Sequence, residues 1–417
     1  MSTLIYNNYA NSSCFVEETI RVIRACHEKK GLAGLDYLTY ITAHILRHED
    51  QTSHEYWKCN QSLLNLDERW YSLLNDSNRK NLGTYLSNIS PTLSLYKSDN
   101  VRLLVNRAPA GNDVFYTFVN SLMQNVFSDS FQRFFAEAIF NRQVLVNRIE
   151  NRPVTTLKSN IDKNVTVEDE VVVIETRPNY GHFLTDYLSL YLLLQHNPDL
   201  RHLKVLTYRL MDVQLEILKA YDFDTSRLIQ FDIEPGRGVC IGLRRAYIYN
   251  RINPTFGARY IQNYLPNTKH NDNNDLVFLS RGKFKFSRIA NQSDVEDTLA
   301  RRKFTTLYTH ELTTTEVISR IRNAKIIVTT MGAQIVNALF AVEAIVILIF
   351  PVQPRINELM DLANDKALCH GLSCFKNLRI LRCPVQHVEQ ARAVLDLPSV
   401  VEISQLEQLI DASMAEL

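Results

Sequence analysis

The chain has 417 residues, of which 46% are hydrophobic and 22% are charged. This composition is typical of globular proteins and excludes a disordered or collagen-like chain. Lys and Arg number 46 against 45 Asp and Glu, so the formal net charge is +1 and no overall basic field would attract nucleic acid. The length predicts two or three domains.

The sequence predicts neither a secretory signal nor a membrane helix. The N-terminus lacks a basic start followed by an apolar stretch. The most apolar run, Ala344 to Phe350, is much shorter than the ~20 residues that cross a bilayer. The 7 cysteines are scattered, which favours reduced thiols over a disulfide framework. We therefore expect no transmembrane segment and a cytoplasmic location.

Residues 1–95 have the apolar periodicity of helices. Two of the predicted helices cover Ser53–Leu66 and Glu68–Ser87. The pattern predicts an all-helical N-terminal region. Such a region either caps the next domain or binds a protein partner, and both roles fit the pattern.

Residues 96–265 alternate between predicted strands and predicted helices, which is typical of α/β domains. The predicted strands are Val101–Val105, Val171–Glu175, Leu203–Tyr208, Leu228–Ile233 and Arg245–Tyr249. The predicted helices are Asp113–Phe127, Asp129–Phe140, Phe183–Gln195 and Gln214–Tyr221. This part of the chain is therefore predicted to form a Rossmann-like domain.

Residues 266–417 alternate more regularly. The predicted strands are Leu276–Ser280, Phe304–Tyr308, Lys325–Thr329 and Ile345–Phe350. The predicted helices are Asp294–Arg302, Thr315–Asn323 and Gln334–Ala341. Apolar strands that alternate with helices predict a doubly wound parallel sheet. We expect two Rossmann-like domains with a cleft between them, and a site at the carboxyl ends of the strands.

A basic segment, Ser280–Arg288, directly follows the first strand of this second block. Its four cationic residues are Arg281, Lys283, Lys285 and Arg288. The carboxyl end of a parallel strand is a common place for a ligand, and arginine can hold a phosphate through two hydrogen bonds. The segment therefore indicates either an anion site or a solvated loop.

A short turn with one glycine, Thr329–Gln334, joins a predicted strand to a predicted helix. The first turn of such a helix would offer unpaired N–H groups and a positive dipole end to a phosphate. The turn has neither the dinucleotide-binding pattern nor the P-loop pattern, so it predicts neither class of protein.

The segment Asn179–Asp186 follows a predicted strand of the first block. His182 and Asp186 are four residues apart, so they share one face of a helix. A carboxylate beside an imidazole fixes the tautomer and raises the basicity of the ring, which suits a general base. A hydrogen-bonded pair on a helix surface has the same spacing, so the sequence leaves both interpretations open.

Asp222 and Asp224 have the Asp-x-Asp spacing of metal-dependent sugar transferases. They lie between a predicted helix and a predicted strand, where aspartates often cap turns. We interpret them as turn residues and expect no metal site.

Two stretches together resemble glycosyltransferase family 61. The first is residues 276–340 and the second is the segment 179–186, Asn-Tyr-Gly-His-Phe-Leu-Thr-Asp. The matching positions of the first stretch are Ser280-Arg281, Arg288, Asn291, Glu311-Leu312, Glu316, Ala324-Lys325, Gly332-Ala333 and Asn337.

The resemblance implies an α/β fold of the GT-B type, in which two Rossmann-like domains face one another across a cleft. It implies an inverting glycosyltransferase, a hexosyl- or pentosyltransferase of polysaccharide or glycoprotein biosynthesis. The donor would be a nucleotide-sugar, a UDP-sugar by expectation, and the acceptor a saccharide or glycoprotein hydroxyl. No obligatory metal or other cofactor is implied.

The resemblance also assigns roles to residues. Asp186 or His182 would be the catalytic base. The donor would be bound by Arg281, Lys283, Arg288, Asn291, Glu311, Gly332, Ala333 and Gln334. Arginine, lysine and the helix dipole would take the place of a metal on the diphosphate.

Met331 departs from the family pattern, which usually has His before Gly-Ala. Methionine neither carries charge nor donates a hydrogen bond. Two alternatives therefore stay open beside the enzyme. One is a non-catalytic relative that binds nucleotide-sugar or glycan, and the other is an adaptor that binds a partner through residues 1–95.

Overall fold

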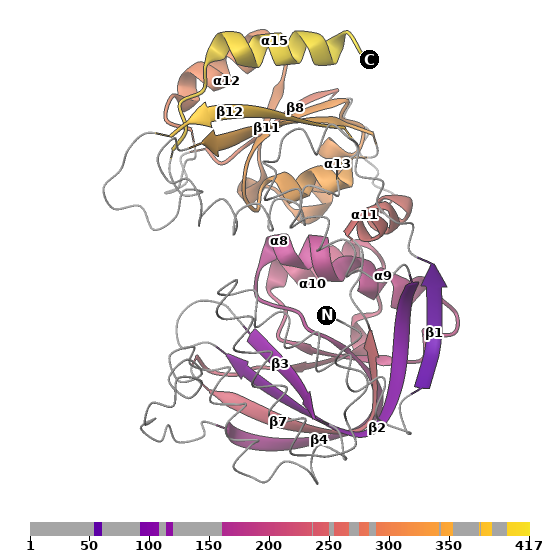
Figure 1. Ribbon diagram of the computed structural model, residues 1–417. Coiled ribbons are helices and arrows are strands. Elements are labelled where there is room, and N and C mark those ends of the chain that lie inside the picture. The colour runs from indigo at the N-terminus through magenta and orange to yellow at the C-terminus, as the bar shows by residue number, and fades with distance from the viewer. Residues whose placement is uncertain are drawn as a thin grey trace, which may run out of the picture.

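A computed structural model describes two packed units, each built on one β-sheet (Figure 1). We call residues 54–266 the first unit and residues 275–417 the second unit. The structure describes residues 54–60, 92–107, 114–119, 161–235, 237–249, 254–266, 275–282, 289–341, 343–352, 375, 377–385 and 398–417.

The first unit contains a 7-stranded mixed sheet in the order β1-β2-β7-β4-β5-β6, with β3 paired to β2. Its strands are β1 (His54–Asn60), β2 (Thr92–Arg107), β3 (Val114–Val119), β4 (Ile161–Ile174), β5 (Lys204–Tyr208), β6 (Leu228–Phe231) and β7 (Gly238–Tyr249). Strands β7, β4, β5 and β6 run parallel to one another, whereas β1, β2 and β3 pair antiparallel. The parallel part has the strand order of a Rossmann half, and the antiparallel part is an addition that the sequence pattern did not predict.

Two helical predictions in this region are wrong. His54–Asn60 is a strand paired to β2, inside the predicted helix 53–66, and Val114–Val119 is a strand inside the predicted helix 113–127. Strand β2 also starts before the expected boundary at residues 95 and 96. Pairing with β2 overrides local helical spacing at both strands, across about 40 positions for β1 and with the adjacent strand in the sequence for β3. The rest of the predicted N-terminal helices and the predicted helix 129–140 lie outside the described residues.

Helices cover the face of the first sheet that is turned toward the second unit (Figure 1). They are α8 (Tyr180–His182), the π-helical segment η1 (Phe183–Tyr187), α9 (Leu188–His196), α10 (Asp212–Ala220) and α11 (Pro254–Asn263). On the other face the long strands bend, and side chains of β2, β4, β5 and β7 form a separate apolar core, which includes Leu103, Val173, Leu206 and Ile241. Register shifts between β4 and β7 accompany the bend.

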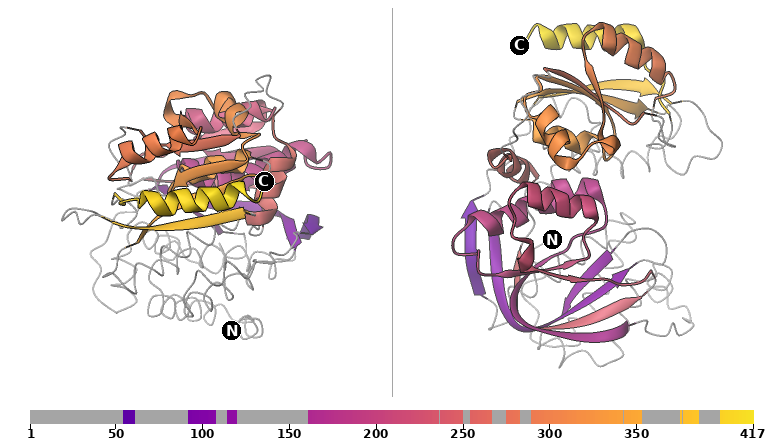
Figure 2. Two further views of the ribbon diagram at one scale, coloured as in Figure 1. Left: turned by 90° about the horizontal axis from the view of Figure 1, so that it is seen from above. Right: turned by 180° about the vertical axis from the view of Figure 1, so that it is seen from behind.

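The second unit contains a 5-stranded sheet in the order β12-β11-β10-β8-β9, and every pairing is parallel. Its strands are β8 (Leu276–Ser280), β9 (Thr305–Tyr308), β10 (Ile326–Thr330), β11 (Ile345–Val352) and β12 (Asn377–Pro384). Both faces of the sheet are covered (Figure 2). The covering elements are α12 (Gln292–Arg301) and α15 (Ile403–Met414) on one face, and α13 (Thr314–Ile321) and the 3-10 helix η4 (Ile335–Phe340) on the other. The expected doubly wound parallel sheet is confirmed.

The two units share one continuous apolar core. It contains Phe183 and Leu188 of the first unit together with Val317, Ile318 and Leu339 of the second. Helix α10 packs against α13, and α11 packs against η4. Among the described residues, this interface is a packed apolar layer formed by helices of the two units.

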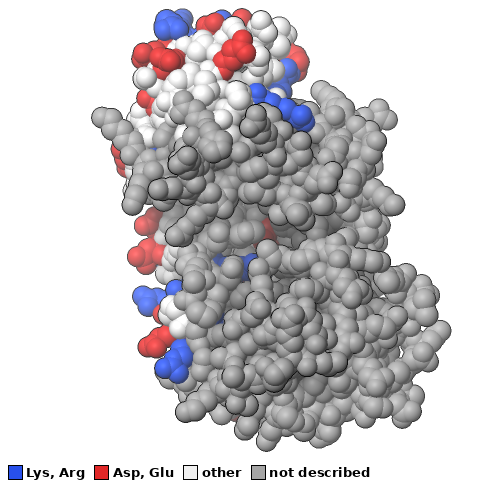
Figure 3. Space-filling view, turned by 60° about the vertical axis from the view of Figure 1, so that its left-hand side comes forward, with Lys and Arg blue, Asp and Glu red and all other residues white. Residues whose placement is uncertain are grey.

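In the described part of the chain, no helix is long and apolar enough to cross a membrane. Acidic and basic side chains lie side by side on the described part of the face in Figure 3. This mixture agrees with the net charge of +1.

Candidate functional site

The site forms where the strand order of the second sheet reverses. Strands β8 and β10 are neighbours although β9 lies between them in sequence, so β9 and β10 leave on opposite sides of β8. Loops diverge at such a switch point and leave a crevice beyond the carboxyl ends of the strands. The basic segment follows β8 and the glycine turn follows β10, so the fold brings these two predicted features together.

The loop after β8 is held by the Ser280 side chain. The Ser280 hydroxyl lies 2.9 Å from a carboxylate oxygen of Glu296 and accepts a hydrogen bond of 2.9 Å from the backbone N–H of Gly282. Gln292 donates to both Ser280 and Glu296, at 2.8 Å each. Arg281 is half-buried between Ser280 and Gly282. This network fixes the start of the basic segment, while Lys283 and Arg288 lie outside the described residues.

The turn after β10 differs from the prediction. Residues 331–334 form a turn, and the expected helix 334–341 is a six-residue 3-10 helix. The predicted N-terminus of an α-helix at this position is therefore wrong. Gly332 has a positive φ of 120°, which L side chains rarely adopt. Gln334 is buried and donates from Nε2 to the Ser280 carbonyl at 3.0 Å, which ties this turn to the loop after β8.

The His182–Asp186 pair lies on the helical segment after β4. Asn179 caps the start of that segment by accepting from the His182 backbone N–H at 3.1 Å. The predicted contact between the two side chains is present, with 2.9 Å between His182 Nδ1 and Asp186 Oδ2. The other carboxylate oxygen accepts from the Thr185 hydroxyl at 2.6 Å. The His182 side chain is 48% exposed and that of Asp186 is 19% exposed, so the imidazole is the more accessible of the two.

The helix is locally widened at this position. Phe183–Tyr187 form a π-helical segment, and single π-helical turns inside α-helices occur frequently at functional sites. Phe183 and Leu184 are fully buried, which anchors the segment below the pair. The geometry therefore presents a carboxylate-held imidazole on a fixed support.

The segment with the His182–Asp186 pair meets the glycine turn of the second unit. A Cβ placed on Gly181 would lie 3.8 Å from both Cα and Cβ of Ala333. The Tyr180 hydroxyl donates to the side-chain oxygen of Asn337. Three segments that are far apart in sequence, after β4, β8 and β10, thus converge.

A comparison with protein-family models matches residues 180–348 to the family described as Glycosyltransferase 61. The match begins at Tyr180, at the start of the segment with the His182–Asp186 pair, and ends within β11. The predicted resemblance to glycosyltransferase family 61 is therefore confirmed over these residues.

Two further comparisons complete this result. Among solved structures, the bacterial iron-containing dodecameric glycosyltransferase TibC from enterotoxigenic E. coli H10407 is similar at 9% sequence identity. The similarity covers 61% of this chain and 75% of TibC, with a TM-score of 0.25. No curated protein matches the chain.

Two predicted donor-binding residues of the glycosyltransferase 61 segment have other surroundings. Asn291 donates to the Val401 carbonyl and accepts from the Val401 N–H, both at 2.9 Å, so its side chain joins α12 to the segment before α15. Glu311 is exposed at the end of the short helix that follows β9, 3.6 Å from His310. Glu311 thus lies beyond the carboxyl end of β9, the strand that pairs with β8.

The Asp-x-Asp segment is a turn, as predicted. Asp222 has a positive φ of 56°, and Asp224 accepts from the Ser226 backbone N–H at 3.0 Å. Among the described residues, no group of three or more His, Cys, Asp or Glu side chains could hold a metal ion.

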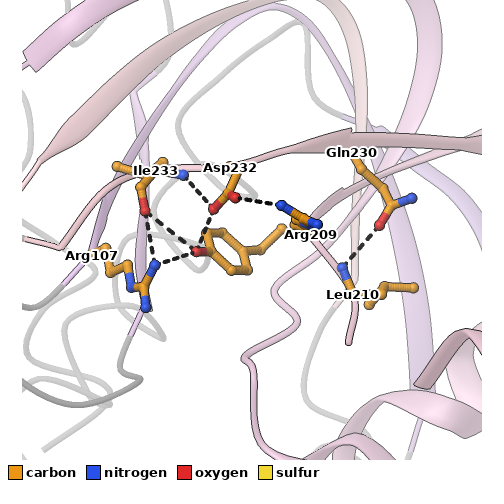
Figure 4. Close-up of polar contacts among 7 residues, drawn as sticks. Arg107, Arg209, Leu210, Gln230, Asp232 and Ile233 are labelled. Carbon is orange, nitrogen blue, oxygen red and sulfur yellow. Dashed lines mark hydrogen bonds and ion pairs between the residues drawn. The ribbon is translucent and has the colours of Figure 1, made fainter. Parts of the chain in front are cut away.

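A second polar cluster lies at the carboxyl ends of β5 and β6 (Figure 4). The Tyr208 hydroxyl donates to Asp232 at 2.7 Å, and Arg107 donates to that hydroxyl at 3.1 Å and to the Ile233 carbonyl at 3.2 Å. Arg209 donates to the other Asp232 oxygen at 3.3 Å. Burial and the neighbouring Asp232 carboxylate raise the pKa of Tyr208 to about 12. Because Arg107 ends β2, the cluster joins the end of that strand to the carboxyl ends of β5 and β6.

Tyr180 and Glu296 are site residues that the sequence pattern did not predict, and Asn337 had no predicted role. Tyr180 stands directly before Gly-His in the segment after β4, and Glu296 is four residues after Gln292 on one helix face. A tyrosine beside a candidate base and a carboxylate facing a strand end are signals that could have identified the first two. The contact between Tyr180 and Asn337 depends on the packing of the two units and has no local signal.

Proposed function

We propose that this chain is an inverting, metal-independent glycosyltransferase of the GT-B type. It moves a sugar from a nucleotide-sugar, a UDP-sugar by expectation, to a hydroxyl of a saccharide or glycoprotein. Residues 96–265 would form the acceptor side and residues 266–417 the donor side. The observation that carries the proposal is the convergence of the His182–Asp186 segment with the loops after β8 and β10.

His182 suits the role of the base. It would remove the proton from the acceptor hydroxyl as that oxygen attacks the anomeric carbon. Asp186 already accepts a hydrogen bond from Thr185 and holds His182 through Nδ1, which leaves Nε2 as the ring nitrogen to receive the proton. Asp186 would then orient the ring and stabilise its charged form.

The leaving group is a nucleoside diphosphate. As the bond between the anomeric carbon and the phosphate oxygen breaks, negative charge grows on the diphosphate and needs a cation or hydrogen-bond donors. Arg281 stands at the carboxyl end of β8, and Lys283 and Arg288 follow it in the same segment. Cations of this kind would take the role that a metal ion has in other transferases, and their presence in the sequence supports metal independence.

A donor screen tests the proposal. The purified chain is mixed with UDP-, GDP-, CMP- and TDP-sugars, with and without EDTA, while binding and release of free nucleotide are followed. We expect one nucleotide class to bind and to be slowly hydrolysed at the same rate in EDTA. Loss of release in EDTA would contradict metal independence, and no binding at all would contradict the donor site.

Two substitutions assign the roles. Arg281→Ala should weaken donor binding at least tenfold, because charge-assisted hydrogen bonds to phosphate are strong. His182→Ala should lower kcat by about 10²–10⁴ and leave donor affinity within twofold, because a general base acts only in the chemical step. Arg302→Ala is the matched control, since Arg302 pairs with Asp411 on the outer face of the second unit. Equal effects of Arg281→Ala and Arg302→Ala would place the diphosphate elsewhere.

A second candidate function rests on Met331. Its side chain is 7% exposed and packs in the core shared by the two units, where the family pattern usually has a histidine. A relative that binds a nucleotide-sugar without transferring it would keep the loops after β8 and β10 and dispense with that imidazole. Donor binding without nucleotide release, for the wild type and for Met331→His, would favour this candidate.

A further inference from the structure

A continuous chain of hydrogen bonds joins the first unit to the loop after β8. The Tyr180 hydroxyl donates to Asn337 Oδ1, Asn337 Nδ2 donates to the Gln334 carbonyl at 3.1 Å, and Gln334 Nε2 donates to the Ser280 carbonyl at 3.0 Å. Its two ends lie two residues before His182 and one residue before Arg281. This chain of hydrogen bonds thus connects the segment of the proposed base with the loop of the proposed phosphate ligand.

The chemistry of these groups fixes the direction of each bond. A backbone carbonyl only accepts, so the Gln334 and Ser280 carbonyls each require an N–H from their amide partner. Asn337 must therefore turn its nitrogen to Gln334 and its oxygen to Tyr180, and the Tyr180 hydroxyl must donate. A single arrangement of the two amides satisfies the whole chain.

The three residues of the second unit in this chain are buried. Ser280 and Asn337 are each 2% exposed and Gln334 is 7% exposed. A polar group buried at this level needs its partner, because water does not replace a lost bond. Other hydrogen bonds between described residues also cross between the units, from Thr314 to Glu216, from Gln262 to the Ala341 carbonyl and from Arg322 to the Pro266 carbonyl, and none of them touches the His182–Asp186 segment.

We propose that Tyr180, Asn337 and Gln334 are positioning residues that hold the His182–Asp186 pair in register with the donor loop at Ser280–Arg281. The inference rests on the proposed function for the identity of the base and the donor. Apolar packing between the units sets their separation, but it is not directional. The hydrogen-bond chain adds the direction that a base needs to face one anomeric carbon, since a misplacement of about 1 Å can lower a rate by about 10².

Kinetic measurements on Tyr180→Phe test this role. The substitution removes one hydroxyl and leaves the ring, the His182–Asp186 pair and the Gln334–Ser280 bond in place. We expect kcat to fall by about ten- to a hundredfold, with donor affinity unchanged within about twofold. Gln334→Met, which breaks the chain beside the donor loop, should lower both kcat and donor affinity.

Tyr191→Phe is the matched control. Tyr191 is a fully buried tyrosine whose hydroxyl bonds to Thr176 at 2.9 Å and Thr207 at 3.1 Å, all within the first unit. The same atom is lost from a similar environment without a link to the second unit. Tyr191→Phe should lower the Tm and leave kcat within twofold. An equal fall of kcat in Tyr180→Phe and Tyr191→Phe would overturn the positioning role.

Hydrogen exchange gives a readout that needs no turnover. If the chain of hydrogen bonds positions residues 179–186, Tyr180→Phe and Gln334→Met should each raise amide exchange in these residues about tenfold relative to β10. Tyr191→Phe should not produce this local change. Unchanged exchange in residues 179–186 would overturn the inference, even for a wild type that transfers no sugar. No donor turnover together with faster exchange would contradict the proposed function and support the positioning role.

Discussion

The interactions that stabilise the first unit internally differ from those that stabilise the second unit. In the first unit, charged side chains join strands that are distant in sequence: Arg245 of β7 forms ion pairs with Asp99 of β2 and Glu170 of β4. Arg227 is buried in the same unit and donates to several backbone carbonyls. The second unit repeats strand and helix at short intervals, and the strands at its centre are apolar. A fold with distant pairings uses directional polar bonds to fix its register, and a regular α/β repeat depends on apolar packing.

This difference matters for function because the proposed base and the proposed donor loop belong to different units. The second unit places its loops through the strand order and through hydrogen bonds of Ser280 and Gln334 within the same unit. The segment of the first unit is placed by its own sheet and by the Tyr180–Asn337 bond across the interface. Substitutions in the two units should therefore differ in size and in kind, and three predictions test this.

The largest stability effect is expected at Arg227 of the first unit. Arg227 is 8% exposed, and its guanidinium donates to the carbonyls of Leu194, Leu200 and Leu203 at 2.8–3.1 Å. Arg227→Met fills a similar volume but leaves these carbonyls without the donor. The free energy of unfolding, measured with urea, should fall by about 3 kcal/mol.

The control for Arg227 is Arg209→Met, in the same unit. The Arg209 side chain is 71% exposed and pairs with Asp232, so its removal should change the free energy of unfolding by less than about 1 kcal/mol. Equal losses for the two variants would show that buried polar bonds do not distinguish the first unit.

The second prediction concerns alkaline pH. Burial raises the pKa of Tyr191 from an ordinary value near 10 to about 12, while its hydrogen bonds with Thr176 and Thr207 lower the pKa by less. Below pH 10 the hydroxyl is neutral in both states, and its contribution to stability is fully present. As the pH rises from 10 to 12, only the unfolded chain ionises, so the folded state loses about 2–3 kcal/mol. Urea unfolding of wild type and Tyr191→Phe across this range measures the difference. The same slope in both proteins would contradict the assignment.

The fold of the second unit could be predicted from the sequence because its signals are local. Strand β8 has the predicted bounds, Leu276–Ser280, since an apolar run of that length between polar residues has few other solutions. Strand β1 was predicted as a helix, because its pairing to β2 is set by residues about 40 positions away. Strand β3 pairs antiparallel with β2, which is adjacent to it in the sequence, so the pairing itself and not the distance explains why this strand was missed. Local pattern fails where the partner of a strand is distant or antiparallel.

The candidate site divides in the same way. The His182–Asp186 contact follows from a spacing of four residues, and the sequence predicted it. The short 3-10 helix after β10 was not predictable, because its residues are all buried between the two units and show no amphipathic period. The link from Tyr180 to Asn337 joins residues 157 positions apart, so only the packed units define it.

The third prediction tests the donor loop of the second unit at Gly282. This residue has a positive φ of 57°, and a Cβ placed on it would lie 2.9 Å from two ring carbons of Tyr308. Gly282→Ala should lower the free energy of unfolding by about 1–2 kcal/mol through backbone strain and displace the loop that begins at Arg281. Donor affinity should fall as well, because the apolar packing of the sheet does not hold the displaced loop in its original position.

Gly242→Ala in β7 is the matched control, because a Cβ there would have only ordinary contacts of 3.7 Å with Val165 and Thr166. In a strand, alanine is favoured over glycine by about 0.5–1 kcal/mol, so this variant should be as stable as the wild type or more so. The double variant Gly282→Ala with Tyr308→Ala separates the two causes: removal of the ring relieves the contact and leaves the backbone strain. Full recovery of donor affinity in the double variant would mean that the tyrosine ring, and not the backbone conformation, sets the position of the loop. No loss in Gly282→Ala would contradict a rigid donor loop, and the directional control of the site would then come from the first unit alone.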